Sequence, residues 1–415
     1  MIQNVIDEAR RCLKCKNPRC KKGCPVNTAI PEVIELLLNN EIFTAGDILF
    51  ENNPLSIVCS MICPHEKQCE GHCILGIKGE PVKFSIIEKY ISTNYMEEAK
   101  FTKPEPQNRK VAIIGSGPAG ITIAFILALK GYSITIFEAH DKIGGVLRYG
   151  IPEFRLPKDV LDKMKETLIK LGVKIRPNIL VGPILTIEDI LEDGYEAAFI
   201  GTGVWNPNKL RIKGESLGNV HYAIDYLKNP DVYDLGERVC VIGAGNVAMD
   251  VASTAKRKGI KDVIVMYRRG REDMTATKLE IKEAEEDGAE FQFYKSPLEI
   301  LDDGVKYIET KQIQLGDGTF KLENIEGSEG MLKVDTVIIA ASQGPRSNIV
   351  SKSTDIQTNI KGLVITDDCG RTTKEGVFAS GDVVTGAKTV VEAVRLSKKV
   401  ALAIEEYVEG KKNIE

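Results

Sequence analysis

Two glycine turns, each lying directly between a buried strand and a helix, constrain the fold more than any other feature of this sequence. The first, GSGPAG at 115–120, follows KVAII and opens the helical stretch ITIAFILALKG. The second, GAGNVA at 243–248, follows RVCVI in the same way, and in both cases another apolar strand comes next. Such a turn brings backbone amides at a helix N-terminus close to a pyrophosphate. The sequence therefore predicts two βαβ dinucleotide-binding units in an α/β chain.

The residues that end the second strand of each unit predict different nucleotides. Glu138 ends the first, and its carboxylate can accept hydrogen bonds from ribose hydroxyls. Arg268 and Arg269 end the second, with Arg271 close behind and no acid at that position. Guanidinium groups favour a 2′-phosphate, which a carboxylate repels. We expect FAD at the first turn and NADPH at the second, with NADH possible; the alternative for the arginines is a solvated strand end.

A third turn supports a flavin in the first unit. Gly381 and Asp382 follow the strand GVFAS and precede a helix whose first turn contains Thr389 and Val390. In flavoproteins with two dinucleotide folds, an acid at this place bonds the ribityl or phosphate region, and the helix dipole stabilises reduced flavin. The alternative is an ordinary loop aspartate.

The length of 415 residues predicts two or three domains. GYEAAFIGTGVWNP and VDTVIIAASQGP mark the places where the chain leaves one dinucleotide domain and returns to it, so one domain is predicted to lie inserted in the other. Thr28 is expected to cap a helix that contains Pro31, the stretch 301–335 carries hairpin signals, and the Pro-rich stretch 101–109 is a boundary. The expected domains are a helical one at 1–107, the FAD domain at 108–205 and 346–415, and the NAD(P)H domain at 206–345.

Composition excludes several classes of partner. The formal net charge of −4 offers no electrostatic case for nucleic acid or an anionic membrane. The longest apolar run, Ile121 to Leu129, is far shorter than the roughly 20 residues that span a bilayer. The N-terminus shows no apolar signal region. We therefore expect a cytoplasmic protein in a reduced compartment.

Eight of the ten cysteines lie in two short stretches, CLKCKNPRCKKGC at 12–24 and CSMICPHEKQCEGHC at 59–73. Zinc favours tidy C-x2-C pairs with a spacer, and disulfides need an oxidising compartment. Iron–sulfur clusters favour a close C-x2-C, a more distant cysteine and a further cysteine followed by proline. Both stretches contain Cys-Pro, so iron–sulfur clusters are the favoured interpretation over zinc and disulfides. Clusters carry single electrons, and a flavin joins them to a two-electron hydride donor.

Together these motifs, with FEAHDKIGGVLRYGIPEFRLPKDV and YRRGREDM, resemble the glutamate synthase small (β) subunit family over nearly the whole chain. That family includes the N-terminal half of dihydropyrimidine dehydrogenase and the large subunit of the bifurcating ferredoxin:NADP oxidoreductase. The resemblance implies two [4Fe–4S] clusters, one FAD and one NAD(P)H site. Hydride transfer needs no general base, so no catalytic residue is assigned.

The resemblance also implies the cluster ligands. One cluster is expected on Cys12, Cys15, Cys20 and Cys73. The other is expected on Cys24, Cys63, Cys69 and Glu88. Cys59 is the alternative to Glu88 as the fourth ligand of this cluster. If Glu88 is not a ligand, it is expected to be a solvated carboxylate on a helix. His65 and His72 are expected to have ordinary roles near the clusters.

The implied nucleotide contacts follow the turns. Those to FAD are Gly115, Gly117, Pro118, Ala119, Gly120, Glu138, Gly145, Arg155, Val181, Gly381, Asp382, Thr389 and Val390. Those to the nicotinamide cofactor are Gly243, Gly245, Asn246, Val247, Arg268, Arg269, Ala341 and Ser342. Arg155 has the alternative of pairing with a local acid. Many relatives have Ala-Ile-Gly-Gln where this sequence has Ala340-Ala341-Ser342-Gln343.

The favoured function is an electron-transfer subunit that passes electrons between NAD(P)H, FAD and two clusters to a partner. The partner is a larger catalytic subunit or a ferredoxin-type acceptor, in a hetero-oligomer. Alternatives within the family are the NAD(P)H-oxidising subunit of a dihydropyrimidine dehydrogenase or a ferredoxin:NADP oxidoreductase-type subunit. A disulfide reductase would need a redox-active cysteine pair beside the flavin, and a zinc scaffold would contain no iron.

Overall fold

The computed structural model describes residues 2–316, 318–347, 349, 353 and 355–412. Residue contacts divide the chain into two compact units. The first consists of Met1–Arg148, Glu153–Val204 and Gly344–Glu415, and the second of Tyr149–Pro152 and Trp205–Gln343. The chain thus enters the second unit from the first and returns, as the insertion predicts.

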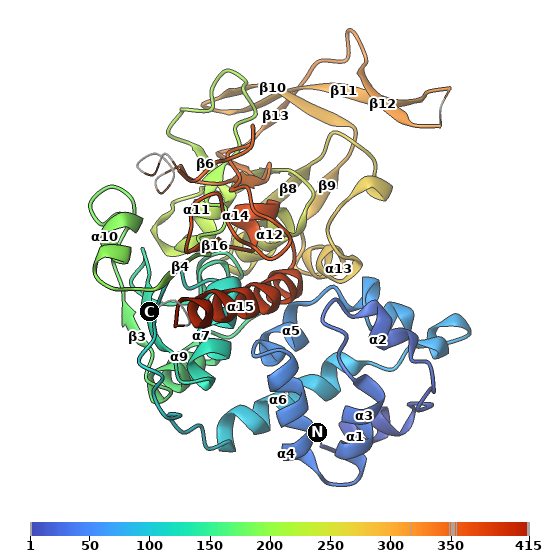
Figure 1. The fold of residues 1–415 in the computed structure, drawn as a ribbon. Coiled ribbons are helices and arrows are strands. Elements are labelled where there is room, and N and C mark those ends of the chain that lie inside the picture. Colours follow the sequence, from blue (N-terminus) through green and yellow to red (C-terminus); the bar gives the residue numbers. More distant parts are fainter. Residues whose placement is uncertain (1, 317, 348, 350–352, 354, 413–415) are drawn as a thin grey trace. The chain divides into compact units, whose positions relative to one another are not determined.

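The N-terminal part of the first unit is helical (Figure 1). Its elements are α1 (Ile2–Arg10), α2 (Arg19–Gly23), α3 (Ile30–Leu38), α4 (Ile42–Asn52), α5 (Ser56–Ile62), the short 3-10 helices η1 (His65–Lys67), η2 (Glu70–His72) and η3 (Ile74–Ile77), and α6 (Phe84–Glu98). Helices α3, α4 and α6 share one core, because apolar residues recur at helical spacing on their inner faces. The expected cap is wrong: Ala29, not Thr28, precedes α3, and Thr28 instead bonds Cys24.

The rest of the first unit is built on a five-stranded parallel sheet. Its strand order is β16 (Val377–Ala379), β4 (Ala197–Ile200), β1 (Lys110–Ile114), β2 (Ser133–Phe137) and β3 (Lys174–Arg176). The strands are continuous apolar runs because both faces of a parallel sheet are covered. β16 comes from the C-terminal segment and pairs with β4, Val377 opposite Ala198. This pairing closes the sheet after the inserted unit.

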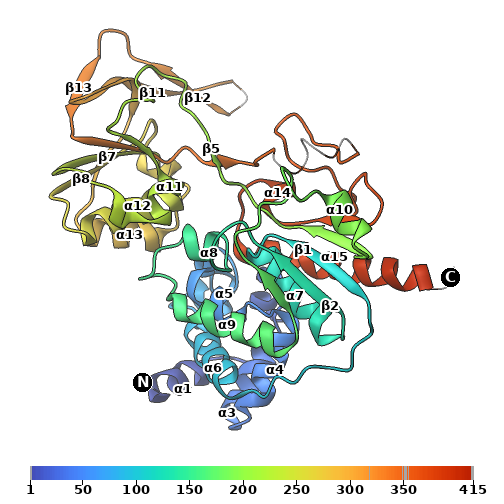
Figure 2. The same ribbon diagram turned by 90° about the vertical axis from the view of Figure 1, so that its left-hand side faces the viewer.

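The remaining elements of this part are α7 (Pro118–Leu129), α8 (Val146–Tyr149), α9 (Lys158–Lys170), α10 (Ile187–Glu192), α14 (Asp382–Thr385) and α15 (Val390–Lys412). The glycine turn 115–120 joins β1 to α7, which is buried along most of its length. Helix α15 packs beside α7 (Figures 1 and 2). The C-terminal helix therefore lies next to the helix that the first glycine turn opens.

The second unit repeats the parallel design. Its sheet has the order β6 (Val220–Tyr222), β14 (Thr336–Ile339), β7 (Arg238–Ile242), β8 (Asp262–Met266) and β9 (Glu290–Gln292). Its helices are α11 (Ala223–Lys228), η4 (Pro230–Val232), α12 (Asn246–Arg257), η5 (Arg271–Asp273) and α13 (Lys278–Glu286). The connecting strands β5 (Asn206–Pro207) and β15 (Gln343–Gly344) pair with each other.

An antiparallel sheet completes the second unit. It contains β10 (Lys295–Leu301), β11 (Gly304–Gln314), β12 (Phe320–Asn324) and β13 (Gly330–Lys333) (Figure 1). The hairpins predicted in 301–335 are therefore confirmed. So is the fold class, with two Rossmann-like units and a helical N-terminal part. Among the described residues, no helix has the length and apolar character that crossing a membrane requires.

Candidate functional site

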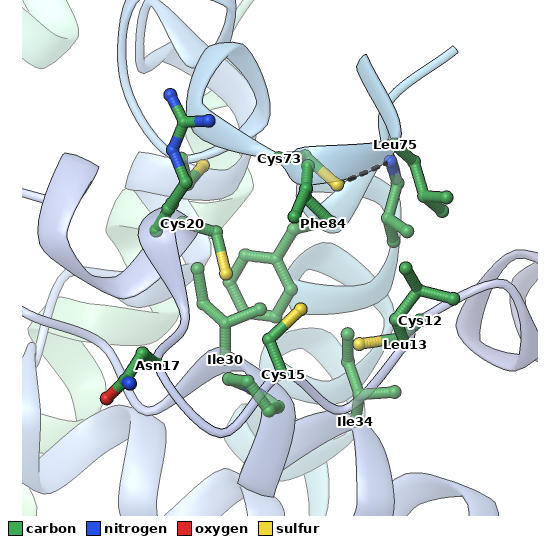
Figure 3. A pocket seen from close by; sticks show the side chains of 15 residues that line it. Cys12, Leu13, Cys15, Asn17, Cys20, Ile30, Ile34, Cys73, Leu75 and Phe84 are labelled. Carbon is green, nitrogen blue, oxygen red and sulfur yellow. Dashed lines mark hydrogen bonds between the residues drawn. The ribbon is translucent and has the colours of Figure 1, made fainter. Parts of the chain in front are cut away.

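Five cysteines line a cavity of about 90 Å³ in the helical part of the first unit: Cys69 and the four that were expected to share one cluster. Cys12 and Cys15 come from the loop after α1, Cys20 from α2, and Cys73 from the turn between η2 and η3. Figure 3 shows their sulfurs directed into the cavity. Apolar side chains, among them Ile30, Ile34 and Phe84, form most of the remaining wall. The structure thus brings together the four residues that were expected to share one cluster.

Two of these thiols, Cys12 and Cys20, hold their protons more tightly than an ordinary thiol does. Burial raises the pKa of Cys20 to about 11 and also raises the pKa of Cys12. Cys73 Sγ accepts a hydrogen bond of 3.5 Å from the Val82 amide. Iron binding would therefore displace protons from these sulfurs, and such an N–H donor is the kind of group that tunes a cluster.

A second cavity, of about 20 Å³, lies next to the first. The two share Ile30, Cys69 and Phe84 as walls. The candidate ligands that line the second cavity are Cys24, Cys59, Cys63, Cys69 and Glu88. Cys24 lies at the C-terminal end of α2, Cys59 lies in α5, and Cys63 follows the last residue of α5. Cys69 lies in the loop before η2, and Glu88 lies in α6. Across the described residues, no three His, Cys, Asp or Glu side chains lie close enough to hold a single metal ion.

Both candidates for the fourth ligand of the second cavity are buried. Glu88 is 6% exposed and Cys59 is 2% exposed, so Glu88 is not a solvated helix carboxylate. Burial, together with Cys59 and Glu70, holds the pKa of Glu88 well above its ordinary value. The hydrogen bond that the Cys63 thiol donates to Cys59, together with burial, likewise raises the pKa of Cys63. A buried carboxyl with a raised pKa holds its proton, and iron bound at this site would take the place of that proton.

One polar atom beside the second cavity lacks a partner. His65 lines the cavity, and its Nε2 is buried without a hydrogen bond from any described residue. Its ring bonds the Cys59 backbone through the other nitrogen. Buried polar atoms without a hydrogen-bond partner are rare in folded proteins, and this one lies at the wall of the cysteine cavity. The thiols of Cys24, Cys63 and Cys69, with Cys59 and Glu88 beside them, are a donor set that fits an iron–sulfur cluster.

A chain of hydrogen bonds connects the second cavity to α15. Cys24 Sγ contacts Thr28 Oγ1 at 3.3 Å, and Asn52 Nδ2 donates to that hydroxyl at 3.4 Å. Lys398 of α15 donates to the backbone and side-chain oxygens of Asn52, at 2.6 and 2.7 Å. Val391, in the first turn of α15, lines the cavity itself. Sequence reasoning could not have found Lys398 or Asn52, because neither belongs to a motif.

The first glycine turn is packed as a dinucleotide site requires. A Cβ at Gly120 would lie 2.0 Å from the carbonyl oxygen of Gly115, so no side chain fits there. The N-cap Gly117 leaves the amides that begin α7 without a side-chain cap. Such amides favour an anion. Gly115, Pro118, Ala119 and Gly145 lie around the same turn, and the Gly144 amide donates to the Ser116 carbonyl.

Glu138 is buried at the end of β2 and its carboxylate is already well bonded. Oε2 accepts from the Ser116 amide at 2.8 Å, and Oε1 accepts from the amide and Nδ1 of His140 at 2.8 and 2.9 Å. Burial raises the pKa of Glu138, but the hydrogen bonds from His140 and Ser116 outweigh it and leave that pKa below its ordinary value. Glu138 is thus a fixed anion beside the turn, able to accept from ribose hydroxyls.

The other expected flavin residues lie on several segments of the first unit. Asp382 begins α14, and its Oδ1 accepts from the Lys388 amide at 3.2 Å. Burial raises the pKa of Asp382 to about 6. Thr389 precedes α15, where its hydroxyl donates to Glu392 at 2.6 Å, and Val390 is the first residue of that helix. Arg155 is half-buried after α8, and Val181 is 3% exposed in the core of the sheet.

The second glycine turn lies between β7 and α12. A Cβ at Gly243, whose φ is +138°, would meet the Ala340 carbonyl oxygen at 2.4 Å. Gly245 is the N-cap of α12, and Asn246 and Val247 begin the helix without a side-chain cap. Arg268 and Arg269 are exposed after β8, and neither forms an ion pair with any residue that the structure describes. Arg271 differs, because it makes a bidentate pair with Glu285.

Residues 340–343 differ from the Ala-Ile-Gly-Gln of many relatives, and this difference affects the backbone conformation. Ser342 has φ of +66°, in the left-handed region that favours glycine. Its carbonyl accepts from the Asn208 amide at 3.1 Å, and the Ala341 carbonyl accepts from Asn208 Nδ2 at 3.3 Å. Serine therefore stands in a backbone conformation that suits the glycine of many relatives.

The two isolated cysteines are unlike a catalytic pair. Cys240 is fully buried in β7, where burial raises its pKa to about 12. Cys369 lies half-buried in a turn, and both are free thiols. A thiol with so high a pKa is unreactive.

Comparison with known families and proteins agrees with this arrangement. Residues 2–100 match the family described as dihydropyrimidine dehydrogenase domain II, 4Fe-4S cluster. Residues 109–396 match pyridine nucleotide-disulphide oxidoreductase. The glutamate synthase [NADPH] small chain of Escherichia coli is 32% identical, over 97% of this chain and 91% of that protein. The one from Halomonas elongata is 33% identical, over 98% and 91%.

A solved structure shares the fold. FprA from Mycobacterium tuberculosis in complex with NADPH aligns with a TM-score of 0.64 at 17% identity, covering 74% of this chain and 86% of that one. Residues 2–100 lie in the match to the iron–sulfur family and 109–396 in the match to the nucleotide oxidoreductases. The chain belongs to the glutamate synthase small chain family and is an NAD(P)H-dependent iron–sulfur flavoprotein oxidoreductase.

Proposed function

We propose that this chain is the electron-input subunit of a hetero-oligomer, in which electrons pass between NADPH, FAD and two [4Fe–4S] clusters and a larger partner subunit. Relatives are named as small chains or subunits: besides glutamate synthase, one is the NADP(+)-dependent formate dehydrogenase subunit beta of Moorella thermoacetica, 31% identical over 94% of this chain and 60% of that protein. The name of that relative indicates that the same electron-input design serves more than one kind of partner.

The main observation behind the proposal is that the second cysteine cavity contacts helix α15 and also adjoins the first cavity. The second cysteine cavity includes Val391 of α15, and the residue before that helix, Thr389, belongs to the expected flavin site. The first cavity shares Cys69 with the second. The first unit alone therefore contains a continuous series of sites from the flavin turn, through the second cavity, to the first. Short steps between redox sites are what electron transfer requires.

The proposed role of each group of residues follows from its surroundings. FAD, when bound, exchanges a hydride with nicotinamide and gives up electrons singly, and the clusters accept single electrons. Cys12, Cys15, Cys20 and Cys73 would hold the outer cluster. Cys24, Cys63 and Cys69, with Glu88, would hold the inner one. The amides that begin α7 would hold the pyrophosphate, and Glu138 would orient the ribose.

We propose the domain limits 1–107, 108–205 with 346–415, and 206–345. The second compact unit, with its main segment Trp205–Gln343, supports the limits of the NAD(P)H domain. The guanidinium groups of Arg268 and Arg269, which form no ion pair within the described part of the chain, support NADPH as the donor.

The test uses protein purified without oxygen. We expect iron for two clusters, and reduction of both flavin and clusters by NADPH. Cys20→Ala, in the first cavity, should lose about half of the iron. The variant should still reduce menadione, a small quinone that takes electrons from flavin directly, but should fail to reduce a protein acceptor. Cys369→Ala, outside both cavities, is the matched control. Full transfer to the protein acceptor by the Cys20 variant would refute the proposed route.

The fourth ligand is tested by a pair of variants. If Glu88 is the ligand, Glu88→Ala should lower the iron content toward one cluster per chain and Cys59→Ser should leave both in place. The opposite pattern would assign Cys59. Electron paramagnetic resonance of the reduced protein distinguishes loss of a cluster from a changed environment, because an oxygen ligand alters the potential and the spectrum.

A further inference from the structure

The segment that supplies three of the first cavity's cysteines is unusually basic. Between Glu8 and Glu32 the sequence contains no acidic residue, although the whole chain has a formal net charge of −4. The basic residues of the segment are Arg10, Arg11, Lys14, Lys16, Arg19, Lys21 and Lys22. Positive charge is thus concentrated on the loop and short helix that wrap the first cavity.

Three of these residues have internal partners and four do not. Arg10 pairs with Asp7, Arg11 with Glu8 at 2.6 Å, and Lys14 with Glu35 at 2.8 Å. The other four are exposed and form no ion pair with any residue that the structure describes: Lys16, Arg19, Lys21 and Lys22. Solvent weakens the interaction of exposed side chains with charges elsewhere in the same protein. The positive charges of these four residues can therefore pair with acidic groups on the surface of a partner.

Apolar side chains are exposed at the edge of the same cavity. Leu13 is 60% exposed and Ile74 is 44% exposed, and both line the cavity although they come from segments far apart in the sequence. Ile77, 63% exposed, ends the short helix that Ile74 begins. An apolar centre with a charged rim is the composition of a protein–protein interface. Single exposed apolar residues are common, but these occur together at one redox site.

We propose that this surface, the cysteine-loop face, docks an acidic surface of the protein that exchanges electrons with this chain. The cysteine-loop face consists of Leu13, Lys16, Arg19, Lys21, Lys22, Ile74 and Ile77. The inference rests on the proposed function, because it names where and with what charge the partner binds. The apolar residues supply contact area over the first cavity, and the cations steer an acidic partner toward it.

The test compares two double variants with equal charge change. Lys16→Glu/Lys22→Glu alters the cysteine-loop face. Lys170→Glu/Lys361→Glu is the control, because both lysines are exposed and lack ion pairs within the described residues. The probes are an acidic ferredoxin and basic cytochrome c, and the measurement is the Kd for the oxygen-free holoprotein at low ionic strength. Iron content is measured to confirm that both double variants retain their clusters. If the Lys16→Glu/Lys22→Glu protein loses iron, the double variant Lys21→Glu/Lys22→Glu is used in its place.

We expect the cysteine-loop variant to bind ferredoxin about tenfold or more weakly than the control variant and to bind cytochrome c no more weakly. Leu13→Gln should weaken ferredoxin binding at low and high salt alike, since apolar contact is not screened. Equal Kd values for the two double variants, or no ferredoxin binding by the parent protein, would overturn the proposal. Failure of the proposed function has a different signature: ferredoxin binds as expected, but NADPH reduces menadione and not the bound ferredoxin.

Discussion

Three arginines close together in the sequence differ in what they can bind. Arg268 and Arg269 follow β8 as exposed side chains without an ion pair among the described residues. Arg271 is held by Glu285, with one N–O distance of 2.5 Å and another of 2.9 Å. A guanidinium that already has a bidentate carboxylate partner has little left to offer a phosphate. The first two are therefore the candidates for the 2′-phosphate of NADPH, and Arg271 is structural.

Replacing the two free arginines should change cofactor choice. Arg268→Gln/Arg269→Gln is expected to lower kcat/KM for NADPH about tenfold to a hundredfold, because the two exposed charge-assisted contacts together contribute about 1.5–3 kcal/mol. The value for NADH should change little. Steady-state assays with menadione as acceptor measure both. Arg271→Gln is the control and should leave the NADPH-to-NADH ratio as it is; an equal loss with both cofactors in the double variant would contradict the assignment.

Asp382 gives the flavin-free protein a pH dependence. Because burial raises its pKa to about 6, the folded protein holds this proton more tightly than the unfolded chain. The stabilisation is complete below the ordinary pKa of an aspartate and is lost as pH rises through about 6.

Relative to Asp382→Asn, the free energy of unfolding of the parent should therefore fall by on the order of 1 kcal/mol between pH 5 and pH 7.5. Urea denaturation of the flavin-free forms at several pH values measures this difference. Parallel curves for the two proteins would show that the carboxyl does not titrate in this range.

At the scale of elements, α15 joins the flavin sheet to the cysteine helices. Its first turn lines the second cavity and its side packs on α7. Lys398 holds the end of α4 through both oxygens of Asn52, at 2.6 and 2.7 Å. Burial lowers the pKa of Lys398, which the nearby Cys24 partly offsets. One helix thus fixes the cavity's distance from the flavin turn.

Lys398→Met removes both hydrogen bonds while keeping the apolar stem. The free energy of unfolding should fall by about 1–3 kcal/mol, since the Asn52 oxygens are left without their donor. Lys399→Met, at the neighbouring exposed position, is the matched control and should have little effect. Chemical denaturation followed by circular dichroism measures both variants. Equal stability of the two would mean that the lysine adds nothing to the attachment of α15.

At the scale of the whole molecule, the helical part depends on its clusters more than the sheets do. Two cavities interrupt its core, and their walls contain eight cysteines that are not part of any disulfide. Each parallel sheet has a continuous apolar core of its own. Cluster binding therefore contributes to the free energy of folding of residues 2–100.

Removal of the clusters by an iron chelator should lower the unfolding temperature of the helical part by about 10 °C or more and leave the sheets folded. Calorimetry should then resolve an early transition that is absent from the holoprotein. Retained FAD, seen as unchanged flavin fluorescence, reports on the sheet. Loss of flavin together with the clusters would indicate a single cooperative unit instead.

Much of this architecture was predictable from local sequence. The strand–glycine–helix pattern predicted both dinucleotide units, because only glycine permits the packing seen at Gly120 and Gly243. The cysteine spacing predicted iron–sulfur chemistry, since ligands close in sequence reach one cluster. The cap at Thr28 was predicted wrongly: serine and threonine favour helix caps, but here the hydroxyl bonds the Cys24 sulfur instead.

The sequence by itself determined the fold class and the kinds of cofactor, because those depend on residues adjacent along the chain. Only the tertiary structure decided that the two cavities share Cys69 as a wall, that Glu88 and Cys59 both line the second one, and that Lys398 anchors α15 beside it. Those relations join residues that are distant in sequence and belong to no motif. Burial and hydrogen bonding bring them together only once helices and sheet have packed.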